Sequence, residues 1–341
     1  MAGATEDPRD LQPLLDTVAS LVARHALGLP GAYARWTRPD ASGPRDLGLN
    51  PYGCADAVNL LYTLGRLPRG DEERSVWIDT LQSLQDPEDG LFREATHHPI
   101  HTTAHCVATL ELLDARPRHP LRGLAHLREP GAMEAFLDAL DWPGNPWLES
   151  HRGAGLYAAL VLAGDVDAAW EERYFAWLAR EVDSPTGLLR RGCVLQTGEG
   201  EAFLFPHLAG TFHYLFNFEH ARRDLPHPEA LVETCLRIFE GGLFPFSRFV
   251  GFAEIDWVYC LTRSLRRCDH RVADARRALA AFAERHVAFL ASLDPETDDG
   301  LDDLHGLFGT VCALAELQAA LGDRLRSDRP LRLVLDRRPF I

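Results

Sequence analysis

Apolar residues recur along most of the chain at intervals of three and four. Leu11, Leu14, Leu15, Val18 and Leu21 form one such stripe. This spacing places apolar side chains on one face of an α-helix. Alternating runs of β-branched residues between turns, which are typical of strands, are nearly absent. The pattern therefore predicts an all-α protein.

The helical stretches repeat along the chain. Each unit is a helix, a break that contains glycine, and a second helix that opens with polar residues. The predicted second helices begin near residues 54, 102, 152, 208, 254 and 303, at intervals of 46 to 56 residues. Six units of similar length favour a closed ring, because an open solenoid needs polar capping repeats at its ends. We therefore expect an (α/α)6 toroid, in which six helical hairpins close into a barrel.

The whole chain is expected to form one domain. No linker rich in Pro, Gly or Ser divides it, so residues 1–341 are interpreted as a single α/α-toroid domain. The C-terminal tail at 326–341 is expected to pack on the ring.

Charge excludes several classes of function. The formal net charge is −15, and all 35 basic residues are arginine. The absence of lysine excludes a Schiff-base lysine, a pyridoxal-phosphate lysine and a Walker-type phosphate lysine. The arginines form no long basic run, which argues against nucleic acid or an anionic membrane as a partner.

Cysteine usage and hydropathy indicate the compartment. The seven cysteines are an odd number, form no CxxC pair and lie mostly within apolar helical runs, as in a reducing compartment. No stretch has the 18 or more apolar residues that a membrane helix needs, and the N-terminus lacks the apolar segment of a signal peptide. We expect a soluble, cytoplasmic protein; the sequence predicts no oligomeric state.

One repeat resembles a known superfamily. The segment LQSLQDPEDGLF at 81–92, followed by HHPIHTTAHCVATLELL at 97–113, resembles the repeat of protein prenyltransferases and squalene-type terpenoid cyclases. In those enzymes a Gln precedes a Gly-Phe or Gly-Trp loop, and the inner helix opens with His and Thr. Six-hairpin glycosidases, lyases and epimerases share this rhythm. The resemblance implies the α/α-toroid fold and, by itself, no particular activity.

Motifs that those enzymes use for catalysis are missing. The chain has no Asp-x-Asp-Asp acid motif of class II terpenoid cyclases and no Asp-x-Cys pair of the prenyltransferase zinc site. The Cys and Cys-His-Gly zinc motifs of lanthionine cyclases, which also use helical toroids, are absent as well.

The chemistry is expected at one mouth of the ring. The six loops that join first to second helices should emerge on one face, so that the opening turns of the second helices line a common funnel. These turns are rich in acid/base residues, although any one of them has the alternative role of a helix cap. The expected catalytic residues are His101, His105, Glu254, Asp256, Asp302 and His305. The expected substrate-binding residues are Asn50, Tyr52, Asp56, His98, Trp147, Glu149, His151, Arg152, His207, His213, Trp257 and Asp299.

Two local clusters of polar residues allow alternative interpretations. His101 and His105 are four residues apart and share a helix face, a spacing compatible with a divalent metal, but no third ligand is evident. No cofactor is therefore required, and a divalent metal stays an open alternative. The acidic segment at 294–306 either only caps a helix at Asp302 or Asp303, or also supplies a general acid whose pKa is raised by neighbouring carboxylates.

The favoured interpretation is an enzyme with an acid/base site that acts on a carbohydrate or sugar-like small molecule, as a hydrolase, lyase or epimerase. One alternative is a terpenoid cyclase or prenyltransferase-like enzyme that lacks the standard acid or zinc motif; another is a non-catalytic ligand-binding toroid. The lining of the central cavity separates them. Two carboxyls about 5–10 Å apart in a polar cleft favour glycoside chemistry, and a deep, dry aromatic pocket favours isoprenoid chemistry.

Overall fold

The computed structural model describes residues 8–40, 45–194, 204–338 and 340–341. Helices dominate these residues, which confirms the prediction of an all-α protein. The first helices of the six predicted hairpins are α1 (Gln12–Arg24), α3 (Asp71–Gln82), α5 (Ala132–Asp138), α7 (Ala168–Glu181), α9 (Pro228–Glu240) and α11 (Val272–Ser292). The second helices are α2 (Pro51–Thr63), α4 (Pro99–Leu112), α6 (Pro146–Ala163), α8 (Leu204–His220), α10 (Ala253–Leu265) and α12 (Leu304–Leu321).

The remaining elements are short. The 3-10 helices are η1 (Arg122–Arg128), η3 (Gly300–Asp302), η4 (Gly322–Arg324) and η5 (Val334–Asp336). Two strands, β1 (Arg9–Asp10) and β2 (Leu325–Arg326), pair in parallel. This pairing joins the start of the described chain to the segment that follows α12.

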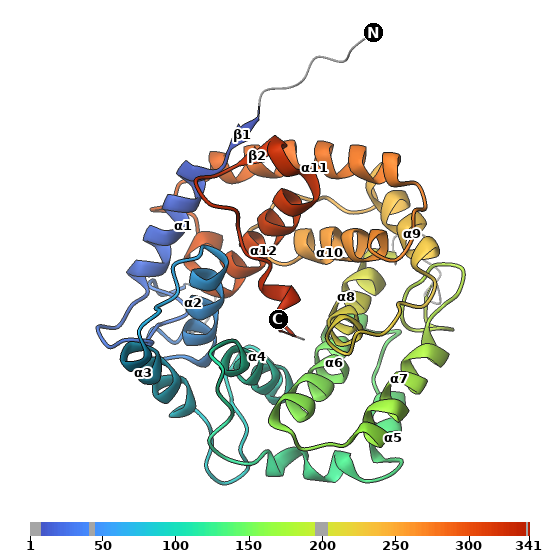
Figure 1. Cartoon of the computed structure of the whole chain (residues 1–341), viewed down its shortest axis with the longest axis horizontal. Coiled ribbons are helices and arrows are strands. Elements are labelled where there is room, and N and C mark those ends of the chain that lie inside the picture. Colours follow the sequence, from blue (N-terminus) through green and yellow to red (C-terminus); the bar gives the residue numbers. More distant parts are fainter. Residues whose placement is uncertain (1–7, 41–44, 195–203, 339) are drawn as a thin grey trace.

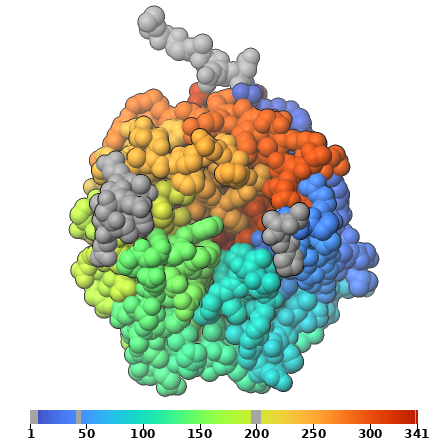
Figure 2. Space-filling view, turned by 180° about the vertical axis from the view of Figure 1, so that it is seen from behind, coloured from blue at the N-terminus to red at the C-terminus, as the bar shows by residue number. Residues whose placement is uncertain are grey.

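The second helices are neighbours in chain order. Helix α2 contacts α4, α4 contacts α6, α6 contacts α8, α8 contacts α10, and α10 contacts α12. Helix α12 in turn contacts α2. Figure 1 shows these helices around the middle of the molecule, with α1, α3, α5, α7, α9 and α11 outside them. In the view from behind, segments from all along the chain surround the middle of the face (Figure 2). A site in the middle is therefore built from residues far apart in sequence.

Burial explains why the two sets of helices differ. The outer helix α1 buries only one stripe, formed by Leu15, Val18, Leu21 and Val22. The inner helix α12 is buried at every position from Leu304 to Gln318. A helix that is apolar all round belongs in a core, whereas an amphipathic helix covers it.

Helix α12 also passes a composition test for a membrane span. The segment Leu304–Arg324 is long and apolar enough to cross a bilayer. However, 72% of its most apolar 18-residue stretch is buried inside the protein. Its apolar character is accounted for by its contacts with α2, α10 and α11.

The C-terminal tail does not stay on the outside of the helices. Its helix η5 contacts α2 and α8. The side chains of Arg338, Phe340 and Ile341 are buried, and Figure 1 shows the C-terminal end in the middle of the molecule. The tail therefore supplies residues to the centre, in addition to packing against the helices.

Candidate functional site

A cavity of about 230 Å³ lies where the opening turns of several inner helices meet. We call it the histidine cavity, because five histidines line it. These come from α4, α6, α8 and α12 and from the loop before α4: His97, His101, His151, His213 and His305. Its other polar or aromatic lining residues are Arg35, Trp147, Phe252 and Asp303.

A buried carboxylate lies beside this cavity and binds two imidazoles. Asp56 of α2 accepts a hydrogen bond from His105 of α4, with 2.8 Å between Oδ1 and Nε2. Its Oδ2 lies 3.1 Å from Nδ1 of His305. Asp56 and His105 are fully buried, and His305 is buried at the cavity wall. Residues 49 and 249 positions away from Asp56 therefore form one network with it.

The charge state of this network follows from its surroundings. Burial alone would raise the pKa of Asp56, but the two imidazoles hold that pKa well below its usual range, so the carboxylate is ionised. Burial lowers the pKa of His105 to about 3, so its ring is neutral. An ionised Asp56 is an acceptor only, so both imidazoles donate to it.

Arg338 of the tail fixes the tautomer of His105. The Arg338 guanidinium donates to His105 Nδ1 over 3.1 Å and to Asn59 and Thr109. Arginine has no acceptor, so Nδ1 of His105 accepts and Nε2 carries the proton given to Asp56. Both ring nitrogens of His105 are therefore occupied.

His305 differs from His105 because only one of its ring nitrogens is hydrogen-bonded within the described residues. Nδ1 donates to Asp56, and Nε2 has no hydrogen-bond partner among the residues that the structure describes. Since His305 lines the histidine cavity, Nε2 is the atom through which it can act on a ligand. A carboxylate that orients an imidazole in this way makes the second nitrogen a proton acceptor.

Tyr52 and Arg35 form the wall next to this network. The Tyr52 hydroxyl makes a short hydrogen bond with Nδ1 of His101, and its ring stacks on His97 at 4.5 Å between centroids. Arg35 binds Asp303 through two parallel hydrogen bonds of 2.8 and 2.9 Å and donates to Thr96. Nη1 of Arg35 also pairs with the buried Glu94 carboxylate at 3.5 Å. These contacts hold a guanidinium at the cavity and leave one N–H of Nη2 unused.

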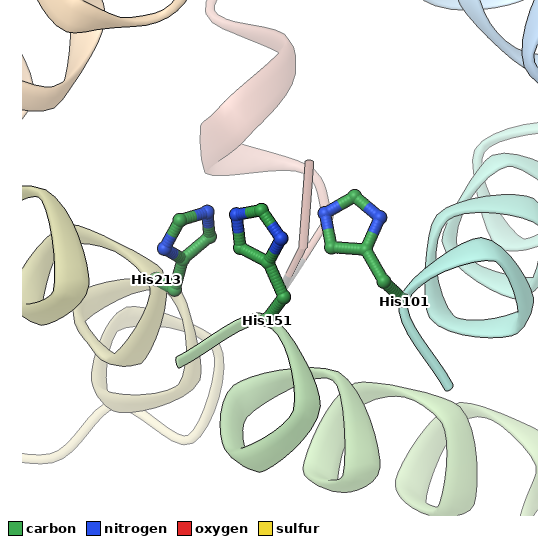
Figure 3. Close-up of side chains that lie close together, drawn as sticks. All are labelled: His101, His151 and His213. Atoms are coloured by element: carbon green, nitrogen blue, oxygen red, sulfur yellow. The ribbon is translucent and has the colours of Figure 1, made fainter. Parts of the chain in front are cut away.

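Three of the cavity histidines form a second cluster. His101, His151 and His213 each have one ring nitrogen within 4.8 Å of the others. Figure 3 shows His151 between His101 and His213, with ring centroids 4.3 and 4.5 Å from its own. Burial lowers the pKa of all three, to about 3 for His213. The cluster is therefore neutral and offers lone pairs.

A larger, mostly apolar pocket adjoins the histidine cavity. It measures about 460 Å³ and shares Trp147, Gly251 and Phe252 with that cavity. Asp256 and Glu254 of α10 lie in its wall. The Oδ1 atom of Asp256 is buried with no hydrogen-bond partner among the described residues. Burial, and then the charge of Glu254, raises the pKa of Asp256 well above its ordinary value.

The structure thus separates the predicted site residues into groups. The histidine cavity and the Asp56 network contain His101, His105, His305, Tyr52, Asp56, Trp147, His151 and His213. Of the predicted catalytic carboxylates, Glu254 and Asp256 lie in the adjoining pocket. His101 and His105 do not form a shared metal pair, because His105 faces Asp56 and Arg338 while His101 faces Tyr52 and His151.

Several predicted site residues make structural contacts: Asn50 and His98, expected to bind substrate, and Asp302, expected to be catalytic. Asn50 and His98 cap α2 and α4 through their side chains. Asp302 binds the backbone N–H groups of Thr37 and Arg38 and holds that loop, while Asp303 caps α12.

The remaining predicted residues do not line the histidine cavity. Trp257 is buried and donates to the Cys235 carbonyl, and His207 bonds to the Leu189 carbonyl. Glu149 and Arg152 form an ion pair one helical turn apart. Asp299 pairs with Arg45 at the surface.

Sequence reasoning missed Arg35, Phe252 and Arg338 as residues of this region. Arg35 stands alone in the apolar segment GAYARW, and Arg338 lies in the tail far from the repeats. Both arginines are buried, each with less than a tenth of its area exposed. The repeat pattern of the sequence gives no indication of this burial.

Comparison with known proteins gives no further guide to this site. No protein-family model, no curated protein and no solved structure matches the chain.

Proposed function

We propose that the six helical hairpins form an (α/α)6 toroid and that the protein is an enzyme that moves a proton on a sugar-like small molecule bound in the histidine cavity. The observation that supports this most is the Asp56–His305 pair. A buried carboxylate orients the imidazole and leaves Nε2 for the substrate. This is the arrangement of a general base.

The proposed step is removal of a proton from carbon next to a carbonyl or carboxylate group. Nε2 of His305 takes the proton, the electron pair of the C–H bond forms a carbon–carbon double bond, and the π pair of the carbonyl moves to its oxygen. Arg35 lines the same cavity and supplies an N–H donor to that oxygen. Protonation of the opposite face of the resulting enolate by a second acid gives an epimerase, and departure of a leaving group with its electron pair from the next carbon gives a lyase.

Hydrolysis by two carboxylates is less well supported. That mechanism needs a pair of carboxyls on either side of the scissile bond. In the histidine cavity, Asp303 is paired with Arg35 and caps α12, and Asp56 lies behind two imidazoles. Of the three reaction classes expected from sequence, lyase and epimerase therefore fit these residues better than glycoside hydrolase.

The size and lining of the cavity suit one sugar ring. A volume of about 230 Å³ is below the usual range for drug-sized ligands, about 300–1,000 Å³. Trp147 is 41% exposed at the rim, where its indole can stack on the apolar face of a sugar.

A second candidate function rests on the adjoining apolar pocket. A buried, protonated Asp256 among Phe205, Phe244 and Phe252 suits protonation of an alkene, the chemistry of isoprenoid cyclisation. The absence of the Asp-x-Asp-Asp motif and the presence of the oriented His305 make this the second choice.

One experiment separates the two candidates. Sugars, sugar acids and isoprenyl diphosphates are screened by thermal shift, and each hit is incubated in D₂O and followed by NMR. Exchange of a carbon-bound proton of a sugar or sugar acid, lost in His305→Gln and kept in Asp256→Asn, supports the first proposal. Conversion of an isoprenyl diphosphate that is lost in Asp256→Asn and kept in His305→Gln overturns it.

A further inference from the structure

The geometry points to a binding site for one divalent transition metal, with zinc the best fit, formed by His101, His151 and His213. The three ligands come from α4, α6 and α8, which are consecutive inner helices. This property goes beyond the proposed proton transfer, and it stands or falls independently of it.

The first support is distance. One ring nitrogen of each histidine lies within 4.8 Å of the other two. Three nitrogens bound tetrahedrally at 2.0–2.1 Å from zinc are about 3.4 Å apart. The rings therefore need to approach by little more than about 1 Å, which small changes in side-chain torsion supply. Figure 3 shows ring nitrogens of His151 facing the rings on either side.

The second support is the outer hydrogen bond of His213. The Ser150 hydroxyl donates its only proton to the Trp147 carbonyl over 2.5 Å. Its oxygen therefore accepts from Nδ1 of His213, 3.0 Å away. This fixes the proton of His213 on Nδ1 and leaves Nε2 as a lone pair. Metal-binding histidines are held by outer partners of this kind.

His101 has an outer partner as well. Its Nδ1 is bound to the Tyr52 hydroxyl, so Nε2 is the atom available to the cluster. Tyr52 is itself fixed by stacking on His97 and His105. Hydrogen bonds on the side away from the cluster thus orient two of the three proposed ligands.

The third support is the availability of the His151 nitrogens. His151 is 6% exposed and lines the histidine cavity, and neither of its ring nitrogens has a hydrogen-bond partner among the described residues. Its contacts are with other rings: Trp147, His97, His101 and His213. A ring nitrogen that lines the cavity without a hydrogen bond is free to bind a metal ion there, together with the nitrogens of the other two histidines.

The other candidate cluster, Asp56 with His105 and His305, is a poorer metal site. There, both nitrogens of His105 are engaged and the Arg338 guanidinium adds a positive charge next to the ring. A metal would have to displace these bonds. In the three-histidine cluster no arginine hydrogen-bonds to a ligand among the described residues.

The choice of metal follows from the ligands. Three imidazoles suit zinc and its neighbours, whereas calcium and magnesium require oxygen ligands. Three protein ligands leave a fourth position for water or a substrate oxygen, as in catalytic zinc sites. Because all three histidines line the histidine cavity, that position would face a bound ligand.

The test is metal binding by the purified full chain. After treatment with a chelator, Co²⁺ is added and its visible absorption is recorded, and Zn²⁺ affinity is measured by calorimetry. We expect one equivalent of metal with the strong visible absorption of tetrahedral Co²⁺. His151→Gln and His213→Gln are expected to weaken binding at least about 100-fold, and Ser150→Ala about 10- to 100-fold.

Matched controls keep this test decisive. His207→Gln changes another buried histidine of α8, which bonds to the Leu189 carbonyl outside the cluster, and should bind metal normally. Circular dichroism without metal checks that each variant is folded. Absence of binding by the wild-type protein overturns the proposal, as does unchanged affinity in a folded His213→Gln. Loss of binding in His105→Gln but not in His213→Gln would place the metal at the other cluster and also overturn it.

The same variants separate this inference from the proposed function. His305→Gln is expected to bind zinc normally while proton exchange on the substrate is lost. If zinc binds but no sugar or sugar acid exchanges a proton, the metal site stands and the proposed function fails. If a substrate proton exchanges and no metal binds, the proposed function stands and the metal site is overturned.

Discussion

At the scale of single residues, hydrogen-bond partners decide which histidine does what. His105 and His305 both donate to Asp56, yet Arg338 occupies the second nitrogen of His105 only. The two rings therefore have different roles, one in holding the carboxylate and one at the cavity. Residue type and spacing in the sequence do not distinguish them.

Replacing Asp56 should remove the orientation of His305. Asp56→Asn keeps the size of the side chain but loses the charge and one of the two acceptor oxygens. We expect the rate on the substrate found by the screen to fall by a factor of about 10²–10⁴, as for loss of general base catalysis. Asp299→Asn, at a surface carboxylate paired with Arg45, is the control and should retain the wild-type rate. A rate close to that of the wild type in folded Asp56→Asn would remove Asp56 from the mechanism.

At the scale of elements, the tail and the inner helices support the site by close packing. Arg338 links the tail to α2 and α4 through Asn59, Thr109 and His105. Burial lowers the pKa of Arg338 to about 10, so it stays charged at neutral pH. It therefore balances the buried negative charge of Asp56.

Removing the buried charge of Arg338 should destabilise the folded protein. Arg338→Met keeps the apolar stem but leaves Asp56 without its positive counterpart, and we expect a loss of about 3–5 kcal/mol in the free energy of unfolding, measured with urea. The neighbouring Arg337 is 41% exposed and pairs with Glu111 and Asp114 at the surface. Arg337→Met should cost at most about 1 kcal/mol. Equal losses in the two variants would contradict the role given to Arg338.

Helix α6 approaches α8 closely at a glycine. A Cβ added at Gly153 would overlap the Tyr214 hydroxyl oxygen, so Gly153→Ala should destabilise the fold by about 1–3 kcal/mol. That hydroxyl has no hydrogen-bond partner among the described residues, so Tyr214→Phe alone should be nearly neutral. Combining the two changes should restore part of the loss, as measured by urea unfolding. A double variant as unstable as Gly153→Ala would contradict this contact as the cause.

At the scale of the whole molecule, burial of many neutral histidines makes stability depend on pH. Burial lowers the pKa of His105 and of His286 to about 3 each, below the ordinary value of 6.5. A histidine with a lowered folded pKa contributes stability that is present above about pH 6.5 and is lost as the pH falls toward the folded pKa, because the unfolded chain then binds the proton.

The expected effect is large. Each such histidine costs about 1.4 kcal/mol for every pH unit below about 6.5, so unfolding free energies measured with urea on chelator-treated protein should fall steeply from about pH 6.5 to about pH 5. His286 lies in α11 and bonds to Ser247, away from the histidine cavity. His286→Gln should reduce the slope by about 1.4 kcal/mol per pH unit. A wild-type curve that is flat over this range would show that these rings are not buried as neutral groups.

The sequence by itself determined the helices and their order. Apolar spacing and glycine breaks are local features, and they predicted all six pairs of helices and the start of each second helix to within a few residues, apart from α6, which begins six residues before the expected position. The acid/base residues of the opening turns were also visible. Closure of the hairpins into a toroid stays a prediction, which the contact between α12 and α2 supports.

Only the tertiary structure decided which of those residues share a site. His207 and His213 lie on the same helix six residues apart, yet one bonds to the Leu189 carbonyl and the other joins His101 and His151. Which way a side chain faces depends on how each helix is rotated against its neighbours, and that rotation is fixed by contacts such as Gly153 with Tyr214. The burial of Arg338 likewise depends on residues more than 200 positions away. Local periodicity sets the helices, whereas long-range packing sets the chemistry between them.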